Sequence, residues 1–178
     1  MSLLVTGGLG FLGLQSAMHF LKRGMVWSPL YKCPVPLRRI TLFDVPSALD
    51  MPIPDAITSD ARVQVATGDL TEAGVADEII DDDELSIVHL ASMVSGDTES
   101  DPVRGWQTNV EGQRLLLEAV RNRAPGARFL FTSSTASLGP VADGASVPDD
   151  TTKLLPQNTY GSVLPHAPIT SAPSSDSD

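Results

Sequence analysis

Three glycines, Gly7, Gly10 and Gly13, form the pattern in this sequence that points most directly to chemistry. They lie in the stretch TGGLGFLG, which follows the short apolar run Leu3-Leu4-Val5 and opens an amphipathic segment. A strand, a glycine turn and a helix in this order form the site where an α/β fold holds the pyrophosphate of a dinucleotide. The pattern therefore predicts a dinucleotide site at the start of the chain.

Each glycine has a separate physical task in such a site. Gly7 lets the chain turn off the strand, and Gly10 lacks a Cβ, so that backbone and phosphates can approach closely. Gly13 allows the helix to pack tightly on the strand. The free N–H groups at the helix start, with the positive end of its dipole, face the anion. Gly8 also fits the spacing GxGxxG, and the alternative is an ordinary strand-to-helix turn.

A carboxylate at the end of the second sheet strand favours one dinucleotide. Asp44 follows the apolar run that ends in Phe43, where an acidic side chain accepts hydrogen bonds from both hydroxyls of the adenosine ribose. It would repel a 2′-phosphate, and the next residues, Val45 and Pro46, bring no cation. We therefore expect NAD rather than NADP, the alternative being that Asp44 only caps a loop.

Further polar residues follow the later strands. Asp69, in Gly68-Asp69-Leu70, is a candidate acceptor for the adenine amino group, or only a turn residue. His89 closes a strand before Leu90 and Ala91 and is interpreted as a satisfied structural histidine rather than a base. Asn109 lies inside a long helix, where asparagine is a poor helix former, and is expected to brace the neighbouring strands.

A serine and a tyrosine complete the candidate chemistry. Ser134 ends the last strand, and Tyr160 follows 26 residues later. A tyrosinate can take the proton of a substrate alcohol while hydride leaves the same carbon, and a serine hydroxyl can hold the substrate oxygen in line. These residue types beside a dinucleotide site predict an oxidoreductase.

The elements that must position these residues alternate between strand and helix. A parallel sheet covered on both faces, a doubly wound α/β (Rossmann) fold, is the class that this order predicts. The segments 24–38 and 45–61 contain several prolines and are predicted to be loops. Strands are expected over 2–6, 39–44, 62–66, 85–91 and 128–132, and helices over 10–23, 71–80 and 102–123.

Composition limits the partners and the compartment. The chain has 178 residues and a net charge of −10, which argues against nucleic acid or an anionic membrane as partner. A single cysteine and the lack of an apolar run of about 20 residues favour a cytoplasmic protein. The acidic run 81–84 is interpreted as a solvated loop, and no metal site is predicted. We expect one domain over 1–161 and a disordered Pro/Ser-rich tail over 162–178.

The motifs together resemble a known family. TGGLGFLG, the Asp44 strand end, GDL, HLA, NVEG, FTSS and YG occur in the order found in extended short-chain dehydrogenases/reductases, the NAD-dependent epimerase/dehydratase group. The stretches HLASMVSGDTESD, NVEGQRLLLEA and FTSSTASLG look most like its D-erythronate dehydrogenase branch. The resemblance covers residues 1–161.

The resemblance implies a role for individual residues. Ser134 is the catalytic hydroxyl that also touches substrate, Tyr160 is the acid/base, and Ser95 is a further substrate contact. The implied NAD-binding residues are Gly7, Gly10, Phe11, Leu12, Gly13, Asp44, Asp69, Leu70, Leu90, Ala91 and Asn109. A small sugar acid or sugar is the implied substrate, and homo-oligomers are an open expectation.

One departure from the family pattern affects the expected activity. The family places a lysine four residues after the tyrosine, where this sequence has Leu164. Pro165 and Pro168 also prevent the long helix that carries the pair in the family. The chain thus looks truncated after the catalytic tyrosine and is expected to lack the C-terminal substrate lobe.

Three functions are consistent with these observations. The first is an NAD-dependent oxidoreductase acting on a sugar acid such as D-erythronate, impaired in this chain, with a nucleotide-sugar epimerase or dehydratase as the alternative enzyme. The second is a catalytically silent NAD-binding module. The third is a fragment that does not fold stably, because an exposed sheet edge and apolar face need cover.

Overall fold

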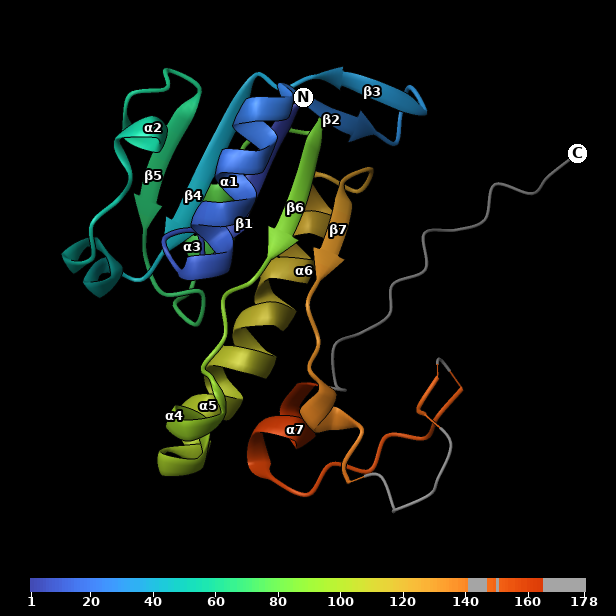
Figure 1. Cartoon of the computed structure of the whole chain (residues 1–178). Helices are drawn as coiled ribbons and strands as arrows, with labels where there is room; N and C mark the ends of the chain where they lie inside the picture. Colours follow the sequence, from blue (N-terminus) through green and yellow to red (C-terminus); the bar gives the residue numbers. More distant parts are fainter. Residues whose placement is uncertain (141–146, 150, 165–178) are drawn as a thin grey trace, which may run out of the picture.

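A five-stranded parallel sheet forms the centre of the molecule (Figure 1), seen in a computed structural model that describes residues 1–140, 147–149 and 151–164. Its strand order is β5-β4-β1-β6-β7. The chain adds strands in one direction from β1 to β5 and then in the other, so the switch point lies between β1 and β6. The strands are β1 (Ser2–Thr6), β4 (Arg39–Asp44), β5 (Val63–Thr67), β6 (Leu85–His89) and β7 (Arg128–Phe131).

Helices cover both faces of this sheet, which confirms the predicted doubly wound class. Alternate residues of β1 point to opposite sides, because side chains in a strand have a period of two. Leu4 packs in the core cluster with α6 (Gln113–Arg123) and α3 (Val75–Ile79), whereas Leu3 and Val5 pack in the cluster with α1 (Phe11–Arg23). Figure 1 shows α1 in front of the sheet and α6 behind it.

The two proline-containing segments are more ordered than the loops predicted for them. Residues 24–38 include an antiparallel hairpin of β2 (Met25–Ser28) and β3 (Cys33–Pro36). Pro34 and Pro36 fit because proline, which lacks an N–H donor, is tolerated in edge strands. The segment 45–61 forms the short helices η1 (Pro46–Asp50) and α2 (Asp55–Thr58), and buried Ile57 anchors the second.

The predicted long helix over 102–123 exists but is interrupted. It begins as α5 (Pro102–Trp106), continues as a π-helical segment, η2 (Gln107–Gly112), and ends as α6. A preceding helix, α4 (Ser95–Ser100), was not predicted, because its sequence SGDTES has no apolar period. The helix predicted over 71–80 is shorter and runs only from Val75 to Ile79.

Among the described residues, two short helices follow the last strand, β7. They are η3 (Thr135–Ser137) and α7 (Thr159–Val163), and α7 packs against α4, α5 and η3 beyond the C-terminal ends of the strands (Figure 1). Helix α7 extends beyond the predicted domain boundary at residue 161. Val163 and Leu164, which follow that boundary, are buried. The predicted disordered tail therefore does not include residues 162–164, and its remainder lies outside the described residues.

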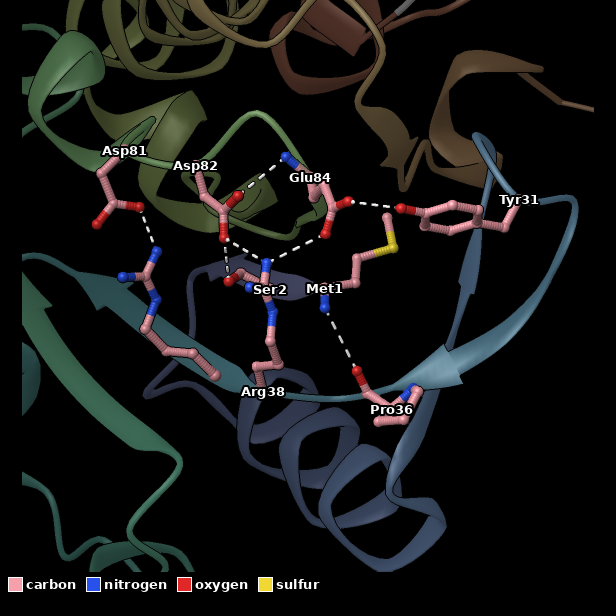
Figure 2. Close-up of polar contacts among 9 residues, drawn as sticks. Met1, Ser2, Tyr31, Pro36, Arg38, Asp81, Asp82 and Glu84 are labelled. Carbon is pink, nitrogen blue, oxygen red and sulfur yellow. Dashed lines mark hydrogen bonds and ion pairs between the residues drawn. The ribbon is translucent and has the colours of Figure 1, made fainter.

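A polar cluster ties the loop 81–84 to the N-terminal ends of the strands (Figure 2). The carboxylate of Asp82 accepts hydrogen bonds from Ser2 Oγ at 2.5 Å and from the backbone N–H of Glu84 at 2.9 Å. Arg38 lies 3.4 Å from Asp82 and 3.2 Å from Glu84, and Arg39 pairs with Asp81. The acidic run is a helix-to-strand loop as predicted, but it is not simply solvated.

These contacts change the proton affinity of Asp82. Burial alone would raise its pKa, but the hydrogen bonds from Ser2 and Glu84 and the charges of Arg38 and Arg39 lower it below the usual value.

No group of acidic, histidine and cysteine side chains suited to a metal ion occurs among the described residues. In the described part of the chain, no helix has the length and apolar character needed to cross a membrane.

Candidate active site

The glycine turn between β1 and α1 is fixed by close backbone contacts. Gly7 has φ +65°, and a Cβ there would lie 2.8 Å from the backbone N of Ala91. A Cβ on Gly13 would lie only 2.3 Å from the carbonyl oxygen of Gly7. Since such distances are impossible for real Cβ atoms, both positions require glycine, and Gly13 brings the helix onto the turn as the motif predicts.

Gly10 has a different environment from the other two glycines. Gly10 is exposed, and a Cβ added there would contact only the carbonyl oxygen of Gly7, at 3.3 Å. It is the N-cap of α1, without a side-chain cap hydrogen bond and without an acidic residue in the first turn. The first backbone N–H groups of a helix have no partner within the helix. Those of Phe11, Leu12 and Gly13 lie at the start of α1, where the sequence predicts that the pyrophosphate binds.

Asp44 borders this turn at the C-terminal end of β4. Its Oδ2 accepts a hydrogen bond from the backbone N–H of Leu9 at 3.0 Å, and Oδ1 accepts one from Val45 at 2.9 Å. These two bonds hold the carboxylate beside the glycine turn and leave further lone pairs on both oxygens, because a carboxylate offers about four acceptor sites. The sequence-based position of Asp44 near the turn is thus found in the structure.

Asp69 follows β5 and lies in a dense hydrogen-bond network. Its Oδ1 accepts from the backbone N–H of Thr71 at 2.9 Å and from the Thr71 hydroxyl at 2.7 Å. Its Oδ2 accepts from the guanidinium of Arg104 at 2.6 Å. Burial alone would raise the pKa of Asp69, but the hydrogen bonds from Thr71 and the charge of Arg104 lower it. The next residue, Leu70, is buried against Gly112 of the π-helical segment.

The loop after β6 lies directly against the glycine turn. Leu90 donates its backbone N–H to the carbonyl oxygen of Thr6 at 3.0 Å, and Ala91 donates to Thr6 Oγ1 at 3.3 Å. Because a Cβ on Gly7 would collide with Leu90 and Ala91, the two loops form one continuous surface at the switch point. This is the position predicted for the backbone that lines the cofactor cleft.

His89 is structural, as its sequence context predicted. It is 2% exposed, and its Nδ1 lies 2.6 Å from Thr6 Oγ1. Thr6 Oγ1 also accepts the backbone N–H of Ala91 at 3.3 Å, so His89, Thr6 and the loop after β6 form one hydrogen-bonded chain. Burial lowers the pKa of His89 to about 4. His89 is therefore neutral at pH 7, and its hydrogen bond with Thr6 links β6 to β1.

Asn109 braces a loop rather than the strands that we expected it to brace. Its Oδ1 accepts from the backbone N–H of Met93 at 2.8 Å, and its Nδ2 donates to the Met93 carbonyl at 3.0 Å. These bonds fix the chain between β6 and α4, which begins at exposed Ser95. Asn109 therefore acts on the loop that follows Ala91, and direct contact with a cofactor stays a prediction, as does the substrate contact of Ser95.

The structure brings the segments of Ser134 and Tyr160 together. Ser134 caps η3, and its Oγ accepts the backbone N–H of Ala136 at 3.2 Å. A Cβ on Gly161, next to Tyr160, would lie 2.3 Å from the Ala136 carbonyl oxygen, so α7 packs tightly on η3. The backbone N–H of Tyr160 donates to Glu99 at 3.0 Å. The position of the family lysine is taken by Leu164, which is only 4% exposed.

Arg104 and the Thr6–His89 pair are among the polar contacts in this region that were not predicted. Arg104 reaches Asp69 from α5, and no spacing rule links residues 35 positions apart. Thr6 bonds to His89, its partner in the register of β1 and β6. The alignment of these two strands could have suggested the second pair, because both residues end their strands. The first depends on the packing of α5 against the loop after β5.

A parallel sheet with a glycine turn at its switch point defines a Rossmann-type nucleotide-binding protein. The chain belongs to the NAD dependent epimerase/dehydratase family, whose model matches residues 3–163. It is 43% identical over 163 residues to a D-erythronate dehydrogenase of Cupriavidus necator and 34% identical over 164 residues to one of Haemophilus influenzae. Each alignment covers 90% of this chain and 46% of the relative. The chain thus spans about half the length of the curated relatives it matches.

Solved structures support the same assignment. A nucleoside-diphosphate-sugar epimerase from Agrobacterium tumefaciens superposes with a TM-score of 0.73 at 26% identity. The superposition covers 94% of this chain and 46% of that structure. The match confirms that the described elements are arranged as in the family fold.

Proposed function

We propose that this chain is the nucleotide-binding part of an NAD-dependent oxidoreductase whose substrate is a small sugar acid such as D-erythronate. The observation that carries the proposal is the uncapped N-terminus of α1, which opens beside Asp44 at the switch point of the sheet. The identity of 43% with a D-erythronate dehydrogenase supports the choice of substrate class.

The described residues offer contacts that would suit the pyrophosphate and the adenosine half of the dinucleotide. The open N–H groups of Phe11 and Leu12 would hold the pyrophosphate, with Gly10 allowing its approach. Asp44 would accept from the adenosine ribose hydroxyls, and the absence of a cation at Val45 and Pro46 favours NAD over NADP. Leu70, Leu90 and Ala91 would border the bound molecule, and Asp69 would accept from the adenine amino group.

The proposed catalytic assignment is supported by the packing of the Ser134 and Tyr160 segments against each other. When bound, NAD accepts a hydride from a substrate carbon. In the proposed site, Ser134 Oγ would hold the substrate oxygen, and Tyr160, as its tyrosinate, would take the substrate hydroxyl proton. Leu164 supplies no amino group to assist Tyr160, so we expect turnover by this chain to be weak.

Buried Leu164 also favours a second candidate function, a catalytically silent NAD-binding module. It would use the same glycine turn and Asp44 but transfer no hydride. This chain is also 29% identical to each of two UDP-glucose 4-epimerases. A nucleotide sugar is therefore an alternative substrate class.

Calorimetry and an activity assay separate these functions. Titration of the 178-residue chain with NAD is expected to give micromolar binding, and the same titration with NADP much weaker binding. NADH formation is then followed with D-erythronate as substrate. Binding with slow NADH formation supports the oxidoreductase, and binding without it supports the silent module. The absence of any NAD binding would reject both.

A further inference from the structure

Arg104 lies at the place where the adenine of a bound dinucleotide is expected. Its guanidinium is 2.6 Å from Oδ2 of Asp69, the predicted acceptor of the adenine amino group. Arg104 comes from α5, which lies beyond the C-terminal ends of the strands (Figure 1). The guanidinium of Arg104 on α5 therefore contacts Oδ2 of Asp69, the carboxylate expected to accept from the adenine amine.

The acceptor capacity of Asp69 decides whether this cation excludes the base. A carboxylate has about four lone-pair sites, two on each oxygen. Thr71 fills both sites of Oδ1 through its N–H and its hydroxyl, and Arg104 fills one site of Oδ2. One acceptor site on Oδ2 remains. The network thus leaves room for a single further donor, such as one N–H of an exocyclic amine.

The helix that carries Arg104 is held in place on two sides. Asp101 caps α5 by accepting the backbone N–H of Arg104 itself at 3.0 Å. A Cβ on Gly105 would lie 2.5 Å from the side chain of Thr98, so α5 packs closely on α4. The backbone at Arg104 is therefore fixed relative to the loop, although 48% of its side chain is exposed.

Charge gives Arg104 a second effect. Asp44 ends β4 and Asp69 follows the neighbouring strand, β5, so two carboxylates border the expected adenosine site. The chain carries a net charge of −10, and the cofactor itself is an anion. A guanidinium on Asp69 offsets part of this repulsion, and it does so at the base rather than at the phosphates.

We propose that Arg104 is a positioning residue for the adenine: it fixes the Asp69 carboxylate so that the open site on Oδ2 faces the exocyclic amine. The inference rests on the proposed function, because it assumes that NAD binds with its adenine at Asp69. It assigns to α5 a part in selecting adenine over purines that lack this amine. The opposite role, a competitor that blocks Asp69, predicts tighter NAD binding when Arg104 is removed.

Two cofactors that differ only at the base form the test. NAD carries the exocyclic amine, and nicotinamide hypoxanthine dinucleotide has a carbonyl oxygen in its place. We expect the unmodified chain to bind NAD about tenfold more tightly than the hypoxanthine compound, a typical effect of one hydrogen bond to a charged group. Arg104→Ala is expected to reduce this ratio to about threefold or less, and Arg104→Lys to restore most of it.

The chain offers a matched control for these variants. Arg114 of α6 is 47% exposed and forms ion pairs with Glu118 of the same helix and with Glu111 of η2. Arg114→Ala removes the same charge and should leave the ratio unchanged. Asp69→Ala should make the two affinities nearly equal. Thermal melting of each variant checks that the fold is intact.

The outcomes distinguish the inference from the function on which it rests. If the unmodified chain binds neither cofactor, the proposed function fails. If it binds NAD and Arg104→Ala leaves the ratio unchanged, only the role of Arg104 is overturned. Tighter NAD binding by Arg104→Ala would also overturn it and would identify Arg104 as a competitor.

Discussion

The proposed nucleotide side and the proposed catalytic side of the candidate site differ in how completely this chain builds them. Gly7, Gly13 and Asp44 are held by contacts among the first 91 residues, from three adjacent parallel strands and the loops that follow them. Tyr160 instead lies in a five-residue helix, α7, that ends at buried Leu164. The contacts proposed for the pyrophosphate and the ribose thus come from the centre of the sheet, whereas the proposed catalytic pair lies on elements added late in the chain.

The largest expected effect tests whether the nucleotide side is fixed by packing. Gly13→Ala places a Cβ 2.3 Å from a backbone oxygen, so the chain must shift, at a cost of about 3 kcal/mol or more. Gly10→Ala is the matched control, because its Cβ meets only one atom, at 3.3 Å. We expect Gly10→Ala to fold with nearly unchanged stability but to lose most NAD affinity.

Chemical denaturation and NAD titration of both variants measure the difference. Equal loss of stability in Gly10→Ala and Gly13→Ala would show that the turn has no part specialised for the phosphates.

The next prediction tests the incompleteness of the catalytic side. Leu164→Lys introduces the amino group of the family pattern at a position that is 4% exposed. Because a buried ammonium loses hydration, we expect a loss of roughly 2–4 kcal/mol in the free energy of unfolding and no gain in NADH formation. Leu164→Met, with similar volume, should lose less than about 1.5 kcal/mol. Rapid D-erythronate oxidation by Leu164→Lys would mean that this side lacks only one side chain.

A pH dependence is expected from the nucleotide side through His89. Its pKa is about 4 in the folded chain and 6.5 as the reference value, so the unfolded chain binds more protons between these pH values. The stability is therefore full above pH 6.5 and falls as the pH decreases toward 4, by up to about 3 kcal/mol. Urea denaturation across this range measures the slope, and His89→Gln should flatten it. A slope that survives the substitution would assign the titration to another group.

The smallest effect is expected at the end of the sheet farthest from the cleft. Asp82→Ala removes the partner of Ser2 and Arg38 (Figure 2), and we expect a loss of about 1 kcal/mol, part of it screened by salt. NAD affinity should not change. A loss of NAD affinity equal to that of Gly10→Ala would contradict the separation of the two ends.

The sequence predicted the sheet well because its strands are short apolar runs that end in polar or glycine residues. The limits of β1 and β4 agree with the prediction to the residue. It failed where local rules conflict with tertiary contacts. Pro34 and Pro36 indicated a loop, yet pairing with β2 forms a hairpin, and α4 consists of polar residues that only its packing makes helical.

The candidate site was predictable to the extent that position along a strand implies position in space. Asp44 and Ala91 follow parallel strands, and such strand ends meet at one edge of the sheet. The partner of Asp69 was not predictable, because the rotation of α5 about its axis decides which side chain faces the loop. The hydrogen bond between Tyr160 and Glu99 likewise depends on the packing of two short helices.

The rotation of α5 relative to α6 depends on the helical geometry of the π-helical segment η2, which joins them. Each residue of an α-helix turns the chain by about 100° around its axis, as 3.6 residues complete a turn. In a π-helical turn the hydrogen bonds span one residue more, so each residue turns the chain by less than in an α-helix, and η2 holds about one residue more than an α-helix would over the same rotation. Deleting one residue between Gln107 and Gly112 would therefore convert the segment toward an α-helix and leave Arg104 facing Asp69, whereas one added α-helical residue would turn Arg104 away by about 100°. The π-helical winding of η2 thus lets the chain carry an additional residue while α5 and α6 keep their relative orientation.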